Sequence, residues 1–156
     1  MDPKFARFAD KLHPAFKRLL GGPPVANGAF PKIVPERGVY LFSEAGQHLY
    51  VGRTNRILKR YAGHCNPGAT HLTAAFAFLL ARQDTGRLKA SYKAGADSRA
   101  GLVLDPAFAE AFRSAKARIR GMEFRFVEEA DPTAQCLLEV YAAVVLEAKY
   151  NDFDNH

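Results

Sequence analysis

Two short strand patterns, residues 37–43 and 47–52, constrain the fold of this chain more than any other feature. Only Glu44-Ala45-Gly46 separates the two patterns. A three-residue connection with glycine in its left-handed position is typical of a β-hairpin. In that register Tyr40 is predicted to lie opposite Tyr50, so that two phenols share one face of the sheet.

The remaining patterns are mostly helical, with apolar residues at three- and four-residue spacings. Helices are predicted over residues 5–20 (one kinked helix or two short ones, because of Pro14), from Thr54 or Asn55 to near residue 66, and over 70–82, 107–120 and 131–149. Residues 122–128 alternate as a third strand. The predicted fold is α+β: a small three-stranded antiparallel sheet flanked by helices, with an extra N-terminal helical region and a helical insertion.

The predicted organisation is an N-terminal helical extension and connection over residues 1–35, followed by one main domain over 36–156. An insertion occupies about 81–118, and within it residues 87–105 are expected to form a loop, because two glycines and scattered cations break any period. A chain of 156 residues is long enough to bury a proper core without disulfides.

Charge is distributed unevenly along the chain. Residues 1–64 hold eleven basic and four acidic residues, residues 65–121 hold nine and four, and residues 122–156 hold two and eight. A basic body of this kind is typical of a protein that binds a polyanion, although some basic domains carry such charge only for solubility.

Membrane, secretory and zinc-binding classes are disfavoured. The longest apolar run, residues 74–81, is too short to span a bilayer, and the N-terminal cations are not followed by the apolar stretch of a signal peptide. Cys65 and Cys136 lie 71 positions apart, which predicts neither a metal knuckle nor a disulfide framework. A cytoplasmic location without a membrane partner is expected.

A cationic stripe follows the second strand. Arg56, Arg60 and His64 recur at four-residue spacing, so they share one face of the predicted helix. Forked guanidinium donors suit phosphate oxygens better than ammonium groups do. The alternative is a solvated helix face.

The C-terminal helix contains the second chemical clue. Between Gln135 and Ala148 only Glu139 and Glu147 are charged, so the helix is expected to be buried together with at least one of these glutamates. A buried carboxylate requires a cation, which is either an arginine in a structural salt bridge or a divalent metal ion.

Together these residues resemble the GIY-YIG nuclease superfamily. The matching positions are Gly38-Val39-Tyr40, Tyr50-Val51-Gly52, Arg60, His64, Glu139 and Asn151. The resemblance covers about residues 37–151. Valine replaces isoleucine in both triplets, and 79 positions separate Arg60 from Glu139, more than in compact members of the family.

The resemblance implies a metal-dependent DNA endonuclease that hydrolyses phosphodiester bonds in repair, recombination or restriction. Glu139 would hold a single Mg²⁺ or Mn²⁺ ion, and Arg60 would neutralise charge on the scissile phosphate. Tyr40 would act as general base or orient the attacking water, with Tyr50 and His64 near the nucleophile. The structural brace of the site would be Gly38, Gly52 and Asn151.

The phenol role requires help, because an unperturbed phenol has a pKa of ~10 and is almost wholly protonated at neutral pH. Arg60, the metal ion and a neutral His64 that accepts the proton are expected to lower it. Activity is therefore predicted to rise with pH through the neutral range.

Phosphate contacts are predicted from cations near the site and on the insertion helix. They are Arg53, Arg56 and Lys59, with Arg113, Lys116, Arg118 and Arg120 as weaker candidates. The main alternative is a catalytically inactive nucleic-acid-binding protein on the same scaffold, and the oligomeric state is left open. His13, His48, His71 and Cys65 are interpreted as ordinary packing or surface residues.

Overall fold

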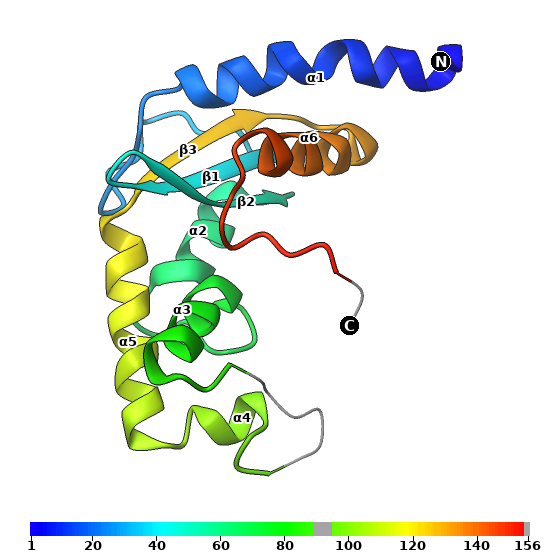
Figure 1. Cartoon of the computed structure of the whole chain (residues 1–156). Helices are drawn as coiled ribbons and strands as arrows, with labels where there is room; N and C mark the ends of the chain where they lie inside the picture. Colours follow the sequence, from blue (N-terminus) through cyan, green and yellow to red (C-terminus); the bar gives the residue numbers. More distant parts are fainter. Residues whose placement is uncertain (89–94, 155–156) are drawn as a thin grey trace. The chain divides into compact units, whose positions relative to one another are not determined.

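The computed structural model describes residues 1–88 and 95–154, which contain six helices and three strands (Figure 1). The chain divides into two compact units, one formed by Met1–Leu58 with Met122–His156 and the other by Lys59–Gly121. This division differs from the sequence interpretation. The N-terminal helix belongs to the same unit as the sheet, and the second unit begins earlier than the predicted insertion.

The first unit is built on a three-stranded antiparallel sheet, in agreement with the predicted α+β class. Strand β1 (Gly38–Glu44) lies between β2 (Gln47–Thr54) and β3 (Glu123–Glu128). The central strand is buried over almost its whole length, which its run of apolar residues requires. β2 and β3 are therefore the two edge strands.

The hairpin between β1 and β2 has a different register from the predicted one. Ala45 and Gly46 both have positive φ, 51° and 77°, so the connection is a two-residue turn that pairs Glu44 with Gln47. An irregularity between Phe42 and Ser43 shifts the pairing further along the strands. Tyr40 consequently lies opposite Gly52 rather than opposite Tyr50, and the predicted cross-strand tyrosine pair is wrong as a register.

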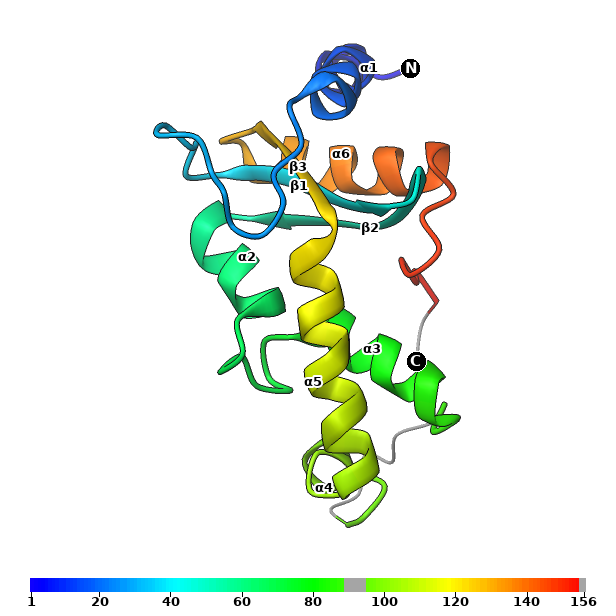
Figure 2. The same cartoon turned by 90° about the vertical axis from the view of Figure 1, so that its left-hand side faces the viewer.

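One face of the sheet, which we call the helix face, is covered by α1 (Pro3–Gly21) and α6 (Pro132–Val145) (Figure 2). Its sheet residues are Val39, Leu41, Val51 and Val127. Side chains from both helices complete this core, among them Phe16 and Leu19 of α1 and Leu138 and Ala142 of α6. Burial of these aliphatic side chains stabilises the unit by roughly 25 cal/mol for each Å² removed from water.

Helix α1 is one helix and not two. Asp2 caps its N-terminus by accepting the amide of Lys4 at 2.8 Å, and Pro3 occupies the first turn, where a missing N–H is harmless. Pro14 lies inside the helix on its exposed side. The buried Phe16 and Leu19 of the following turn hold the helix on the sheet.

Helix α6 ends earlier than predicted. Asp131 caps its start, and the end has a Schellman pattern: the amide of Ala148 donates to Ala143 O at 2.9 Å and that of Glu147 donates to Val144 O at 3.2 Å. Glu147 occupies the left-handed position with φ 50°. The expectation that the helix is buried all round is also wrong, since Val140, Val144 and Val145 are exposed.

The other face of the sheet, which we call the tyrosine face, is aromatic. It carries Tyr40, Phe42, Tyr50, Phe124 and Phe126. Ring centroids of Phe42 and Phe124 lie 4.8 Å apart, and those of Tyr40 and Phe124 lie 5.5 Å apart. The two faces thus follow the period-two alternation of the strands, with aliphatic residues on one side and aromatic residues on the other.

The second unit is helical. Helix α2 (Ile57–Cys65) starts in the first unit and continues into the second, where α3 (Ala75–Thr85), the short α4 (Arg99–Leu102) and α5 (Pro106–Gly121) follow. Phe78 of α3 packs on Phe108 and Phe112 of α5, with centroids 5.0 and 6.1 Å away.

Two predictions for this unit need correction. Helix α3 begins five residues later than expected, because Thr70 and Thr73 form turns, with Thr70 Oγ1 accepting the amide of Leu72 at 3.3 Å. The expected loop over residues 87–105 contains α4, which Ser98 caps by accepting the amide of Gly101. Residues 89–94 of that loop lie outside the described residues.

Candidate functional site

The two tyrosines of the predicted site meet on the tyrosine face, diagonally and not as direct partners. Their ring centroids are 6.5 Å apart with an interplanar angle of 34°. Tyr40 is buried, with 1% of its surface exposed, whereas Tyr50 is half-buried. Tyr50 is therefore the phenol that solvent reaches more directly.

Both glycines predicted as braces are required by close approach. A Cβ on Gly52 would overlap the hydroxyl of Tyr40, because the phenol ring lies across the strand opposite it. A Cβ on Gly38 would overlap the carbonyl oxygen of Val127 on the neighbouring strand. Gly52 thus fixes where the Tyr40 hydroxyl lies, which the predicted register did not foresee.

Glu139 forms an ion pair with an arginine. Its Oε2 accepts from Arg53 Nε at 3.1 Å, and the two side chains are 25% and 46% exposed, respectively. Burial raises the pKa of the Glu139 carboxyl, and the charge and hydrogen bond of Arg53 oppose that rise in part. Of the two glutamates on this segment, Glu139 is therefore the one that burial affects, while Glu147 is exposed.

The tyrosines and the glutamate lie on opposite faces of β2. Arg53 pairs across the sheet with Val39, a core residue of the helix face, so Arg53 and its partner Glu139 belong to that side. Tyr50 and Gly52 point the other way by strand alternation. Because β2 is an edge strand, the two faces of the sheet meet along its outer side.

Asn151 braces this edge. Its side-chain Oδ1 accepts the amide of Val51, and its Nδ2 donates to the carbonyl of Val51, both at 2.8 Å. The amide of Tyr150 also donates to Leu49 O at 2.9 Å. The C-terminal segment therefore binds the backbone of β2 as a short additional strand would, and Asn151 has a structural role there.

Arg60 and His64 belong to α2 in the second unit. Arg60 Nη1 donates to Thr73 O at 2.9 Å, which anchors the guanidinium to the turn before α3. His64 is fully buried, and burial together with the charge of Arg60 lowers its pKa to about 3. His64 is therefore neutral at physiological pH as expected, but a base this weak is a poor acceptor for a phenol proton.

The predicted phosphate-binding cations fall into different environments. Arg56, Lys59, Arg113 and Arg118 are exposed, and Arg113 forms an ion pair with Glu110 on its own helix. Arg120 is half-buried, with Nη1 3.4 Å from Asn66 Oδ1.

The prediction that Lys116 contacts phosphate needs correction. It is buried, donates to Pro67 O at 2.6 Å and to Ala69 O at 2.8 Å, and lies 4.7 Å from the ring centroid of Phe112. Burial also lowers its pKa. Its role is to hold the 66–69 turn against α5, so it is not a surface contact for phosphate.

Glu139 is the residue in this site that fits a divalent ion. In residues 1–88 and 95–154 no three His, Cys, Asp or Glu side chains gather closely enough to form a metal cage. Mg²⁺ does not need such a cage, since it is commonly held by one or two carboxylates, water and substrate phosphate. A partly buried carboxylate fits that mode, and its present cation, Arg53, would have to share it or move aside.

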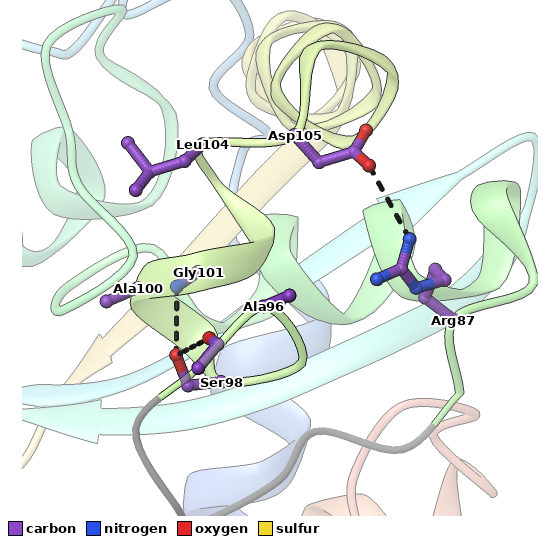
Figure 3. A pocket seen from close by; sticks show the side chains of 8 residues that line it. Arg87, Ala96, Ser98, Ala100, Gly101, Leu104 and Asp105 are labelled. Carbon is purple, nitrogen blue, oxygen red and sulfur yellow. Dashed lines mark hydrogen bonds and ion pairs between the residues drawn. The ribbon is translucent and has the colours of Figure 1, made fainter.

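A separate pocket of about 650 Å³ lies in the second unit (Figure 3). Its lining is largely apolar and includes Ala96, Ala100 and Leu104. Arg87 at its rim is paired with Asp97 at 3.1 Å and with Asp105 at 3.6 Å. The pocket contains none of the residues predicted to be catalytic.

Comparisons of the chain with protein-family models, with curated proteins and with solved structures find no match. Across the described ranges, no helix is both long and apolar enough to cross a membrane. The sequence interpretation missed the partnership of Arg53 with Glu139. The signal that could have found it is position, since Arg53 directly follows the Tyr50-Val51-Gly52 triplet on the edge strand that α6 covers.

Proposed function

We propose that this chain is a divalent-metal-dependent endonuclease that hydrolyses phosphodiester bonds in DNA. The observation that carries the proposal is the set of side chains gathered around β2: two phenols on one face and a burial-perturbed carboxylate on the other. These are the residues on which the resemblance to the GIY-YIG superfamily rests. A perturbed carboxylate beside a cation is typical of catalytic sites, although structural ion pairs also produce it.

The chain's own residues divide the work as follows. Glu139 would hold the metal ion, which would supply positive charge at the scissile phosphate. Tyr40 and Tyr50 orient the attacking water through their hydroxyls. Gly52 fixes the first of these hydroxyls, and Asn151 keeps β2 in register. By the resemblance, Arg60 of the second unit would contribute a permanent positive charge for the scissile phosphate.

His64 has a reduced role in this scheme. A group with a pKa of about 3 neither gains nor loses a proton near neutral pH. We therefore assign it to packing and to donating or accepting one hydrogen bond as a neutral ring. Substrate binding relies on the exposed Arg56 and Lys59 near the start of α2, with Arg113 and Arg118 as further candidates.

The decisive experiment is conversion of supercoiled plasmid to nicked or linear DNA with Mg²⁺, with Mn²⁺ and with EDTA. Metal-dependent cleavage is expected, with at least a ~100-fold loss in Glu139→Gln, since a metal ion supplies several kcal/mol of charge stabilisation. Glu128→Gln is the matched control, because Glu128 is an exposed carboxylate of the same unit. Equal activity of Glu139→Gln and the control would refute the role of Glu139.

One observation favours a second function. Arg53 already neutralises Glu139, as in a structural salt bridge, which suits a DNA-binding protein without turnover. In that case no cleavage of plasmid, single strands or branched DNA would be found with either metal. Salt-sensitive DNA binding would remain, and it would be unchanged by EDTA.

A further inference from the structure

Helix α1 presents a row of cations on the side that faces away from the sheet. Lys4, Arg7, Lys11 and Arg18 are all exposed and recur at spacings of three, four and seven residues. Such spacings place side chains on one stripe of an α-helix. The stripe is on the exposed side of the helix, while Phe16 and Leu19 are buried in the core of the helix face. We call these four residues the outer stripe.

Ion pairs do not neutralise the outer stripe in residues 1–88 and 95–154. Asp10 is the single acidic residue of Pro3–Gly21, and Lys17 adds a further exposed cation at the flank of the stripe. A surface with this excess of positive charge attracts polyanions.

The dimensions of the stripe suit a nucleic-acid backbone. Fourteen residues separate Lys4 from Arg18, which is ~21 Å along a helix axis. One strand of duplex DNA presents a phosphate every ~3.4 Å of its axis, so the stripe can follow about six of them. Long Lys and Arg side chains tolerate the mismatch between the two spacings.

A membrane surface is the other polyanion that a basic amphipathic helix can bind. Such helices insert their apolar face among the lipids. In α1 that face is occupied, because Leu12, Ala15, Phe16 and Leu19 pack on the sheet and on α6. The outer stripe therefore offers charge without an apolar face, which favours nucleic acid.

The stripe and the tyrosines lie on opposite sides of the sheet. Helix α1 covers the helix face and carries the outer stripe on its exposed side, whereas the tyrosines point the other way. A duplex that lies along the outer stripe is therefore on the opposite side of the sheet from the tyrosines. We propose that the outer stripe binds the phosphate backbone of a second nucleic-acid segment, distinct from the one at the tyrosine face.

This inference rests on the proposed function only for the first segment, and binding is measured in EDTA so that cleavage plays no part. The test variant is Arg7→Gln with Lys11→Gln. The control variant is Lys32→Gln with Arg37→Gln, which removes the same two charge types from exposed positions of the same unit. Thermal unfolding of each variant checks that the fold is retained.

The first measurement is affinity for a 20-base-pair duplex between 50 and 200 mM salt. Each phosphate contact contributes ~0.9 to the slope of log affinity against log salt, so the test variant should lose ~1.8 and bind about tenfold or more weakly. The control should change much less. An equal loss in both variants would reduce the effect to net charge and overturn the proposal.

The second measurement is bridging, in which an immobilised duplex captures a labelled second duplex through the protein. Parent and control should bridge with one chain per two duplexes by mass, and the test variant should bind one duplex without bridging. Bridging retained by the test variant would overturn the proposal. So would a loss of binding to phosphatidylserine vesicles in place of DNA, which would assign the stripe to a membrane.

These outcomes are separable from the nuclease test. Plasmid cleavage by the parent, together with an unaltered salt slope in the test variant, would sink the second segment and leave the nuclease intact. Conversely, stripe-dependent bridging without any metal-dependent cleavage would uphold the second segment and remove the catalytic function.

Discussion

The two faces of the sheet in the first unit are built from the same three strands and do different things. The helix face is aliphatic and is sealed by α1 and α6. The tyrosine face is aromatic and carries hydroxyl groups, one of which lies directly over a glycine. Tyr40, Phe42 and Phe124 of the tyrosine face are also fully buried. The contrast indicates that the helix face contributes to the stability of the unit, whereas the tyrosine face contributes both to stability and to the positions of the proposed reacting groups.

The largest effect should come from the helix face. Leu41 is fully buried in the centre of the sheet, and Leu41→Ala should lower the free energy of unfolding by ~2–5 kcal/mol through lost burial and a residual cavity. Urea denaturation measures it, with Ile33→Ala, at a position 86% exposed, as the control. If the Leu41→Ala protein that remains folded also lost its cleavage activity, the assignment of separate roles to the two faces would be wrong.

A smaller loss of stability with a larger loss of activity should follow a change on the tyrosine face. Gly52→Ala forces the Tyr40 ring to move, at a cost of ~1–3 kcal/mol. Metal-dependent cleavage should fall more than unfolding stability predicts. Gly21→Ala is the control, since a Cβ there meets nothing within 4 Å. Unaltered cleavage by a folded Gly52→Ala protein would show that the position of Tyr40 does not matter.

The hydrogen bonds of Asn151 at the edge of β2 should contribute less to the free energy of unfolding. Asn151→Ala removes two hydrogen bonds to Val51 and should cost ~1–2 kcal/mol. Amide exchange at Val51 should accelerate in the same variant, and Asp154→Ala, at an exposed position nearby, should leave it unchanged. An unchanged exchange rate at Val51 in Asn151→Ala would contradict the brace.

The smallest effect concerns protons on the helix side. Because the pKa of Glu139 in the folded chain lies above its ordinary value of 4.5, the folded state holds that proton more tightly. The contribution of Glu139 to stability therefore declines as pH rises from about 4.5 through the raised pKa, whereas the proposed metal binding, which would need the carboxylate, should improve over the same window.

Replacing Arg53 sharpens this prediction. Arg53→Gln removes the charge that holds the Glu139 pKa down, so the acid limb of the cleavage profile should move to higher pH. A ¹³C titration of the Glu139 carboxyl measures the same shift without activity. If neither the acid limb of the cleavage profile nor the ¹³C titration moved in Arg53→Gln, Arg53 would not control the pKa of Glu139. His64, with a pKa of about 3, should contribute nothing above pH 5.

The strands, the division of their side chains between two faces and most of the helices could be predicted from the sequence, because each depends on the local pattern of apolar residues. The hairpin register could not be predicted from the sequence. An Ala-Gly turn with two positive φ values and an irregularity after Phe42 change the pairing by two positions, and neither leaves a signal in apolar spacing. The end of α6 was missed for a similar reason, since Glu147 occupies a position where glycine is usual.

Candidate site residues were predictable by type and less so by surroundings. The burial of Lys116 under the 66–69 turn and the pairing of Arg53 with Glu139 join positions 47 or more residues apart. Local charge and apolar spacing do not identify such distant partners; for Arg53 the usable signal is its position directly after the Tyr50-Val51-Gly52 triplet. The low pKa of His64 likewise follows from complete burial, which a helix position alone does not reveal.

The short pairings at the two margins of the sheet have a consequence for how copies of this chain meet one another. Tyr150 and Asn151 occupy backbone groups of β2, and Val25 exchanges two hydrogen bonds, of 2.8 and 2.7 Å, with Phe124 on β3. An uncovered edge strand is a template for another chain and leads to aggregation. On the outer side of both β2 and β3, one or two residues from another part of the chain already occupy backbone hydrogen-bonding groups. A second molecule therefore finds no continuous row of free backbone groups with which to pair.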